Sequence, residues 1–360
     1  MKGKLKVGIA GFGMIGPVHY RRIYDKSRDI ADVVAIADPN TELLDSNLEK
    51  VLSEIESIDT EFDKNSERSR LKFYDDYRNM LSRSDIDAIH LCLPHNLHTM
   101  AIIDSIKKNK FVIVEKPLGL NFLDISRSED RLGDFNIRKI ALISQNRYNE
   151  EIEWLQKQIS ERTLEIRDID ITIDWYRAQS YYDQNDGWRG RNNSALGGVL
   201  TNQAYHSLDL ALWLTRYNGQ EVKAIGKENS IDKKLHPEID VFDTVRGTLL
   251  LDNARINYYA TTCNPEKKDI TRIKVHFDQG YVEFNTTPEG VSGKSDFLQV
   301  PEFTRDQKLY KTSLGRPSYG FGHGSNIRYA YESFLSEEIP PISFHDGKLV
   351  LKVCDEILKP

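Results

Sequence analysis

The chain has 360 residues, of which 39% are hydrophobic and 29% charged, a balance typical of soluble globular proteins with room for two domains. Its 49 basic and 55 acidic residues give a formal net charge of −6, which argues against a general nucleic-acid binder. No apolar run approaches the roughly 20 residues that span a bilayer, and the first residues lack a signal-peptide pattern. We therefore expect a cytoplasmic protein with no membrane or nucleic-acid partner.

The three cysteines, Cys92, Cys263 and Cys354, are an odd and widely spaced set. They form neither a disulfide framework nor the short spacing that is typical of metal ligands. The sequence therefore predicts reduced cysteines and no metal site.

In the first half of the chain, short β-branched runs alternate with longer helical patterns. The strand candidates are Lys6–Ala10, Val33–Ala37, Ala88–Leu93, Phe111–Val114 and Ile140–Ser144. Helical patterns lie near residues 15–25, 41–58, 97–108 and 122–132. Parallel strands need such long return connections, so the pattern predicts an α/β domain with a doubly wound parallel sheet over residues 1–140.

A heavily charged segment at residues 45–70 makes the second helical pattern look extended. Leu48, Leu52, Ile55 and Phe62 keep rough helical spacing within it. This favours a solvated helix and loop at the edge of the domain. A partner-binding arm is the alternative.

From about Leu164 the pattern changes to consecutive strands. Strand runs cover residues 164–177, 242–252, 254–263 and 270–285. Helices are predicted over Gly198–Leu214, near 324–336 and at the C-terminal end. Consecutive strands without long helices predict an α+β domain with an open, mostly antiparallel sheet over residues 141–360. One face of such a sheet is free for contact, which favours a homo-oligomer, either a dimer or a tetramer.

The stretch KVGIAGFGMIG places glycines directly between a predicted strand and a helix. Gly11 permits a tight turn, Gly13 lets the backbone approach a pyrophosphate, and Gly16 allows close packing of helix on strand. Asp38 ends the next strand, where an acidic residue can hold a ribose hydroxyl and repel a 2′-phosphate. The pattern therefore predicts NAD as cofactor. The expected contacts are Gly11, Phe12, Gly13, Met14, Ile15, Gly16 and Asp38.

Two later strands also end in polar residues, at the edge where doubly wound sheets bind ligands. The loop HLCLPHNLH is expected to line the nicotinamide side with Pro94, His95, Asn96 and His98. A structural role for either histidine is equally open. KFVIVEKPLG ends in Glu115 and Lys116 before a proline, which restricts the residue in front of it. We expect both to lie near the cofactor, with Lys116 pointing into the cleft.

In GGVLTNQAYHSLDLALWL, Asn202 and His206 are four residues apart and would share one face of a helix. Two glycines precede them and permit a close approach of the backbone. Polar groups at the start of an otherwise apolar helix favour a pair that faces a cleft.

Together these motifs resemble the Gfo/Idh/MocA family of NAD(P)-dependent oxidoreductases along nearly the whole chain. SQNRYNEEIEWL is similar to the family's segment between domains, and GHG with PPISFHDGKLVLKVCDEIL is similar to its C-terminal signature. The resemblance implies a Rossmann domain followed by an open sheet with substrate on one face and oligomer contacts on the other. It also implies that NAD accepts hydride from a secondary hydroxyl of a sugar, glycoside or cyclitol.

Residue by residue, the resemblance assigns Lys116 to the reacting hydroxyl and its developing alkoxide, and His206 to general acid–base catalysis. Asn202 stands where many members have aspartate, so it is expected to position a substrate hydroxyl, and either Lys116 or His206 could be the base. Trp188 and Arg189 resemble a WRG segment beside a sugar pocket. The implied substrate contacts are Lys116, Arg147, Trp188, Arg189, Asn202, His206, Tyr319 and His323.

Two other functions stay open at this point. A ketone on a pyranose ring acidifies the neighbouring C–H, which would allow elimination of a glycosidic group before hydride returns, as in an NAD-dependent glycosidase-type enzyme. A non-catalytic NAD-sensing protein would instead bind NAD without turnover.

Overall fold

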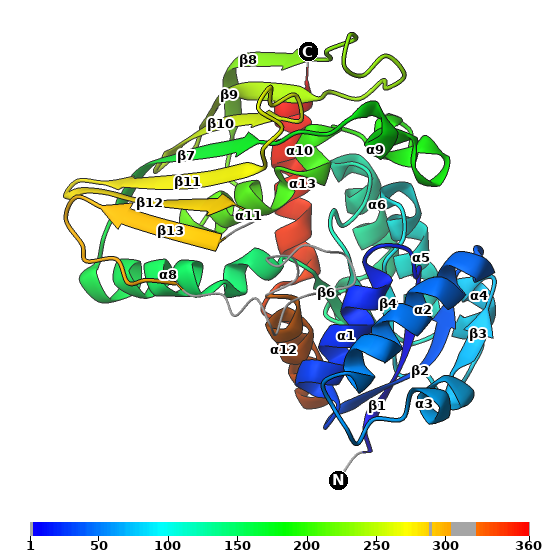
Figure 1. Cartoon of the computed structure of the whole chain (residues 1–360). Coiled ribbons are helices and arrows are strands. Elements are labelled where there is room, and N and C mark those ends of the chain that lie inside the picture. The colour runs from blue at the N-terminus through cyan, green and yellow to red at the C-terminus, as the bar shows by residue number, and fades with distance from the viewer. Residues whose placement is uncertain (1–2, 288–289, 304–321, 360) are drawn as a thin grey trace.

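Six parallel strands form the first sheet, in the spatial order β3-β2-β1-β4-β5-β6 (Figure 1). The computed structural model describes residues 3–287, 290–303 and 322–359. The strands are β1 Leu5–Ala10, β2 Ala31–Ala37, β3 Lys72–Tyr74, β4 Ala88–Leu91, β5 Phe111–Val114 and β6 Ile140–Leu142. This order is that of a doubly wound dinucleotide-binding sheet, so the predicted Rossmann fold is confirmed.

Helices pack on both faces of the first sheet. One face carries α1 Gly16–Ser27, α2 Thr41–Glu56 and α12 His323–Ser336, and the other carries α4 Tyr77–Leu81, α5 His95–Lys107 and α6 Phe122–Leu132. Two short helices are α3 Lys64–Arg70 and α7 Asp134–Ile137. α3 buries none of its residues, in keeping with a solvated segment at the edge of the domain.

The second sheet has seven strands in the order β13-β12-β11-β7-β10-β9-β8. They are β7 Ile166–Asp174, β8 Lys223–Ser230, β9 Thr244–Leu250, β10 Arg255–Thr261, β11 Ile270–Phe277, β12 Gly280–Thr287 and β13 Gly290–Ser295. β7 and β10 run parallel, and the other described pairs are antiparallel. The predicted open, mostly antiparallel sheet is therefore confirmed.

The two faces of the second sheet differ because the strand period is two. On β7, Ile169, Ile171 and Ile173 are buried, and this face packs on α11 (Tyr205–Leu214). The opposite face is polar: Arg255 binds Asp168 at 2.6 Å, for example. Among the described residues, the helices of this lobe therefore lie on the apolar side of the sheet.

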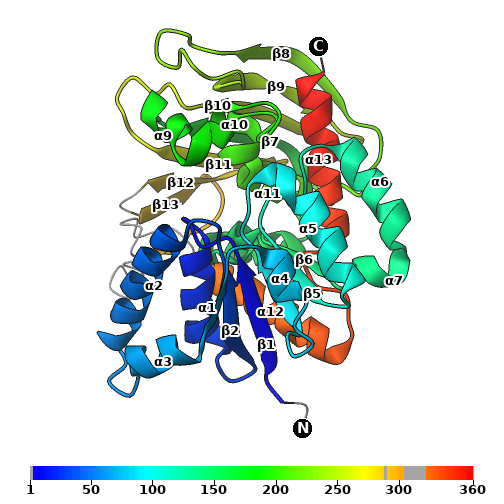
Figure 2. The same cartoon turned by 90° about the vertical axis from the view of Figure 1, so that its right-hand side faces the viewer.

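The C-terminal helices join the two lobes. After the second sheet the chain returns to the first, where α12 packs on α1 and Phe334 stacks on Phe111 with ring centroids 4.5 Å apart. α13 (Phe344–Leu358) then contacts β6, α6, α11 and β8, and so reaches from one sheet to the other (Figures 1 and 2). The two lobes are therefore packed together through α13.

The helix predicted over Gly198–Leu214 is broken, which corrects the sequence-based assignment. The structure has α10 (Val199–Asn202), then Gln203 and Ala204, then α11. Asn202 and His206 therefore belong to different helices and do not share one helical face. The main-chain carbonyl groups left unpaired by this break accept hydrogen bonds from Lys116 of the first lobe.

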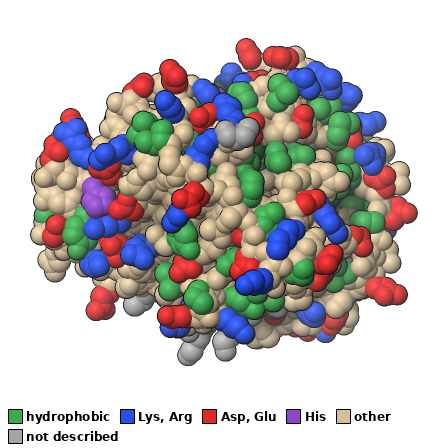
Figure 3. Space-filling view, turned by 90° about the horizontal axis from the view of Figure 1, so that it is seen from above, with side chains coloured by type: hydrophobic (Ala, Val, Ile, Leu, Met, Phe, Trp, Pro, Cys, Tyr) green, Lys and Arg blue, Asp and Glu red, His purple; other side chains and the backbone are tan. Residues whose placement is uncertain are grey.

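The surface carries mixed charge. On the side seen from above β8, acidic and basic side chains lie next to each other, with apolar side chains scattered between them (Figure 3). Within the described ranges, no helix combines the length and the apolar character needed to cross a bilayer.

Candidate active site

The glycine loop after β1 has no room for a side chain at two of its three positions. Gly11 has a φ of +87°, and a Cβ there would lie 2.3 Å from the carbonyl oxygen of Cys92. A Cβ on Gly16 would lie 2.2 Å from the carbonyl oxygen of Gly11. By contrast, no described atom outside its neighbours lies within 4 Å of the Cβ position of Gly13. The loop is therefore tightly packed on one side and open on the other.

Asp38 and Asn47 hold this loop from the next strand and helix. Asp38 accepts the backbone N–H of Phe12 at Oδ2 (2.6 Å) and that of Asn40 at Oδ1 (2.9 Å). Asn47, in α2, donates to the carbonyl oxygens of Phe12 (2.9 Å) and Gly13 (2.7 Å). Each carboxylate oxygen keeps a lone pair, so Asp38 fits a partner with ribose hydroxyls.

The N-terminus of α1 completes an anion site. Ile15 precedes the helix without a side-chain cap, and Pro17 lies in the first turn. The free N–H groups and the positive end of the helix dipole are therefore available to a phosphate. Together with the open side of Gly13 and the carboxylate of Asp38, they fit the pyrophosphate and ribose of a dinucleotide.

Lys116 follows β5 and reaches across to the other lobe. Its Nζ donates to the carbonyl oxygens of Asn202 (2.7 Å) and Thr201 (3.3 Å). A continuous helix would have paired these carbonyls with N–H groups four residues later, so the break between α10 and α11 frees them. Burial, helped by the guanidinium of Arg189 and opposed by Glu115, lowers the pKa of Lys116 to about 8.

His206 lies in the first turn of α11. Its Nε2 is 3.1 Å from Nε2 of Gln145, in the 3₁₀ turn Gln145–Tyr148 after β6. Its Nδ1 is buried and has no hydrogen-bond partner in the described part of the chain. Burial, then the charge of Lys116, lowers the pKa of His206 well below its usual value. The imidazole is therefore neutral near pH 7.

Trp188 and Arg189 face the cofactor lobe from the 3₁₀ segment Asn185–Gly190. The ring of Trp188 packs edge-on against His95, with centroids 4.9 Å apart. The guanidinium of Arg189 lies 4.7 Å from the Trp188 ring centroid and donates to the sulfur of Met14 at 3.3 Å. This segment therefore closes over the start of the glycine loop.

Buried polar atoms without a described hydrogen-bond partner gather around Lys116. They are His206 Nδ1, Gln145 Oε1, Arg189 Nη1 and His95 Nδ1. After burial, the charge of Lys116 is the next cause that lowers the pKa of His95, as it is for His206. A buried polar group without a partner costs about 1–3 kcal/mol, which a polar ligand would offset. The arrangement is therefore that of a site for a small polar molecule.

Comparison with known proteins agrees with this geometry. A model of an oxidoreductase family with an NAD-binding Rossmann fold matches residues 5–131, and a model of the GFO/IDH/MocA C-terminal domain matches residues 155–283. The chain belongs to the GFO/IDH/MocA family. Its cofactor is NAD, as the glycine loop and Asp38 predict.

Three named proteins match this chain over almost their whole length. The chain is 22% identical to the myo-inositol 2-dehydrogenase of Thermotoga maritima, with 96% of this chain and 93% of that protein covered. It is similar to the structure of the WlbA dehydrogenase of Bordetella pertussis in complex with NADH and UDP-GlcNAcA (TM-score 0.75, 21% identity, 98% and 95% covered). It is also similar to levoglucosan dehydrogenase in complex with NADH (TM-score 0.75, 18% identity, 99% and 96% covered). These structural likenesses show the shared fold.

Two predicted substrate contacts of this GFO/IDH/MocA protein, Arg147 and His323, already bind other side chains of the same chain. Arg147 pairs with both carboxylate oxygens of Asp209 (2.6 and 2.9 Å) and with Asp346 (2.9 Å). His323 is 1% exposed, and its Nε2 lies 3.3 Å from Glu115. A buried carboxylate needs a cation, so Arg147 serves the fold. We therefore retain neither residue as a substrate contact, and a further predicted contact, Tyr319, lies outside the described residues.

The predicted cofactor contacts in the loop after β4 have different surroundings in the structure. The His98 ring lies between the carbonyl oxygens of Pro117 (2.7 Å) and Leu93 (2.8 Å), so it holds the loop, which is the structural alternative left open above. His95 instead faces the second lobe, where its ring contacts Trp188. Asn96 is exposed at the start of α5, after Pro94.

Glu115 lies beneath the lysine in a buried polar network. Its Oε1 contacts His19 (2.9 Å) and His323 (3.3 Å). His19 contacts His90 at 2.7 Å, and His90 contacts the hydroxyl of Tyr331 at 2.6 Å. Burial would raise the pKa of Glu115, but the histidine hydrogen bonds lower it well below its usual value. Its other oxygen, Oε2, accepts the backbone N–H of Lys116 at 3.2 Å, so the carboxylate charge lies next to the lysine main chain.

Three residues of this site were not predicted from the sequence: Asn47, His19 and Gln145. Asn47 and His19 lie in amphipathic helices, where nothing in the local pattern distinguishes them from surface or core residues. Gln145 did carry a signal, since it lies in the SQNRYNEEIEWL segment that resembles the family's connection between domains.

Alanine substitutions at Gly13 and Gly16 should have different effects on cofactor binding and on stability. Gly13→Ala places a methyl group where no described protein atom stands, so the fold should persist while NADH binding weakens at least about tenfold, or about 1.4 kcal/mol. Gly16→Ala drives a methyl group into the Gly11 carbonyl and should lower the thermal midpoint as well. NADH fluorescence titration and thermal unfolding of both variants measure this. Unchanged NADH affinity in Gly13→Ala would contradict the placement of the cofactor.

Proposed function

We propose that this protein is an NAD-dependent dehydrogenase that oxidises a secondary hydroxyl of a sugar, glycoside or cyclitol to a ketone. The observation that carries the proposal is the meeting of Lys116, neutral His206 and unpartnered polar atoms beside the glycine loop. The names of the relatives, which include an inositol dehydrogenase and a levoglucosan dehydrogenase, support this substrate class.

Lys116 acts in this proposal as the cation that stabilises the forming alkoxide. Two of its three N–H groups are held by the carbonyl oxygens of Thr201 and Asn202, which leaves the third for the substrate oxygen. The charge on that oxygen grows as the hydroxyl loses its proton, so the interaction is stronger in the transition state than in the ground state.

His206 is the proposed base. It is neutral near pH 7. To act as base at the unpartnered Nδ1, the ring must carry its hydrogen on Nε2, which then donates to the amide oxygen of Gln145 once that amide is turned; this oxygen has no described partner in the present orientation. A base in hydrogen-bond reach of a hydroxyl typically contributes about 10²–10⁴-fold to the rate. When bound, NAD⁺ supplies the hydride acceptor, carbon 4 of its nicotinamide ring.

The residues around this pair suit a hydroxylated ring. Asn202 uses its Nδ2 to donate to the carbonyl oxygen of Gly198 (3.1 Å), so its Oδ1 can accept from a substrate hydroxyl. Arg189 offers its unpartnered Nη1, and Trp188 offers an aromatic face to the ring carbons. Asn202, Arg189 and Trp188 are therefore the proposed substrate contacts beside Lys116 and His206.

A substrate panel tests the proposal. The purified protein is incubated with NAD⁺ and cyclitols, free sugars, nucleotide sugars or glycosides, while NADH absorbance and substrate loss are followed together. NADH formation with one substrate class is expected, and Lys116→Ala should lower kcat at least about 100-fold with NADH binding retained. Substrate loss without net NADH would instead indicate the oxidation–elimination reaction. NADH binding without turnover of any substrate would favour a sensor.

The pH profile separates the two candidate bases. If Lys116 acts as a cation, kcat/KM should fall above about pH 8, because the pKa of Lys116 is about 8 and its charge is lost there. Lys116→Arg keeps its charge and should move this alkaline decline to higher pH, at a reduced rate. A rate that rises through pH 8 in the wild type and loses this rise in Lys116→Arg would make Lys116 the base.

We also infer that a second copy of the chain covers the polar face of the second sheet. Two apolar side chains, Ile225 and Tyr259, are 40% and 37% exposed on this face, which no described helix covers. Light scattering should give a dimer or tetramer for the wild type. The double variant Ile225→Lys, Tyr259→Lys should shift it to monomer, whereas Ile339→Lys, at a 53% exposed position elsewhere, should not. A monomeric wild type would refute the inference.

A further inference from the structure

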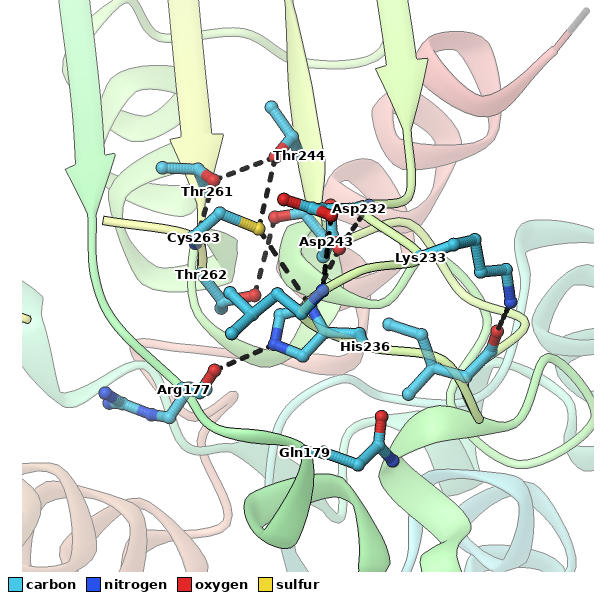
Figure 4. Close-up of polar contacts among 12 residues, drawn as sticks. Arg177, Gln179, Asp232, Lys233, His236, Asp243, Thr244, Thr261, Thr262 and Cys263 are labelled. Atoms are coloured by element: carbon cyan, nitrogen blue, oxygen red, sulfur yellow. Dashed lines mark hydrogen bonds and ion pairs between the residues drawn. The ribbon is translucent and has the colours of Figure 1, made fainter. Parts of the chain in front are cut away.

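Three side chains with different metal-binding atoms meet away from the active site. His236 lies in the loop between β8 and β9, Asp243 directly precedes β9, and Cys263 follows β10 (Figure 4). His236 Nδ1 is 2.8 Å from Asp243 Oδ2 and 3.9 Å from Cys263 Sγ. One donor atom of each residue lies within 4.8 Å of the other two. Segments that are distant in sequence thus bring nitrogen, oxygen and sulfur to one point.

The orientation of His236 is that of a metal ligand. Its Nε2 lies 2.8 Å from the carbonyl oxygen of Arg177, so Nε2 carries a hydrogen and donates it there. Metal-bound histidines commonly donate their second ring N–H in this way, which fixes the tautomer and directs the other nitrogen to the ion. Here the other nitrogen, Nδ1, faces Asp243 and Cys263.

Asp243 supplies an independent observation. Both Asp243 and His236 are 0% exposed. Asp243 Oδ2 accepts the backbone N–H of Asp232 (2.8 Å) and contacts His236, but the buried Oδ1 has no partner among the described residues. Because Oδ1 shares a carbon with Oδ2, it belongs to the same small volume as Nδ1. A protonated His236 pairs only with Oδ2, so an ion pair between these two side chains still leaves Oδ1 without a hydrogen-bond partner.

We propose that His236, Asp243 and Cys263 bind one Zn²⁺ ion. Imidazole nitrogen, carboxylate oxygen and thiolate sulfur are the ligands that zinc takes in tetrahedral sites. Cys263 is half-buried, so the ion can enter from solvent and water can take the fourth position. Binding releases the thiol proton of Cys263 and the Nδ1 proton of His236 to solvent, and no oxidation state changes.

The ion would fix the loop at residues 231–243 against the substrate side of the lobe. Asp240 in this loop donates its N–H to the carbonyl oxygen of Gly190 (2.9 Å) and accepts the N–H of Asn192 at Oδ1 (2.6 Å). Gly190 directly follows Arg189, a proposed substrate contact. The proposed ion therefore holds a loop beside the substrate contacts and takes no part in the dehydrogenase reaction.

Metal content tests the proposal. The full-length protein is stripped with a chelator, incubated with ZnCl₂, passed through gel filtration and analysed for zinc. We expect about one zinc per chain in the wild type and in Cys354→Ala, which removes a buried thiol elsewhere. Cys263→Ser and Asp243→Asn should retain less than about a tenth of that amount. Zinc that is absent from the wild type, or unchanged in Cys263→Ser, would overturn the proposal.

Cobalt substitution tests it without relying on a folded variant. Co²⁺ added to the stripped wild type should give the near-ultraviolet absorption of a thiolate–cobalt bond and the visible bands of tetrahedral geometry. Cys354→Ala should give the same spectrum, and Cys263→Ser should lose the thiolate band. A wild-type spectrum without that band would reject Cys263 as a ligand, whatever the outcome of the substrate panel.

Discussion

The interaction on which the site depends is the hydrogen bonding of the Lys116 ammonium to two main-chain carbonyls of the other lobe. It needs a broken helix on one side, since only an interrupted helix leaves adjacent carbonyls unpaired in its interior. On the other side it needs the buried carboxylate of Glu115, which opposes the fall in the lysine pKa. The lysine thus belongs to both lobes, and any substrate it touches must lie between them.

A second buried pair makes this arrangement rigid. Arg147 lies just after the first sheet and binds Asp209 in α11 and Asp346 in α13, three elements that meet where the lobes join. Removing one partner of a buried ion pair costs about 3–5 kcal/mol, so a rotation of the lobes that parted these groups would be strongly unfavourable. These ion pairs therefore favour one relative orientation of the two lobes.

Both sheets and the NAD-binding loop could be predicted from sequence, because each rests on local pattern. The strand–glycine–helix order locates the NAD loop, and Lys116 ends a strand whose neighbours define the binding edge. What could not be predicted depends on contacts across the chain. Helical periodicity continues through Gln203, so only the lysine that binds the released carbonyls explains the break. Likewise, the guanidinium of Arg147 looks like a ligand group until its buried carboxylate partners are seen.

The same contacts explain why Asn202 can replace the aspartate that many family members carry. The main-chain carbonyl of Asn202 holds Lys116, and a main-chain group is present whatever the side chain is. The side chain at this position is thus not needed to hold Lys116 and can differ in charge. An aspartate would add a negative charge beside the ammonium and raise its pKa, whereas the amide leaves that pKa near the value set by burial and Arg189. The main chain of Asn202 therefore positions the lysine, while its neutral side chain leaves the lysine pKa to burial, Glu115 and Arg189.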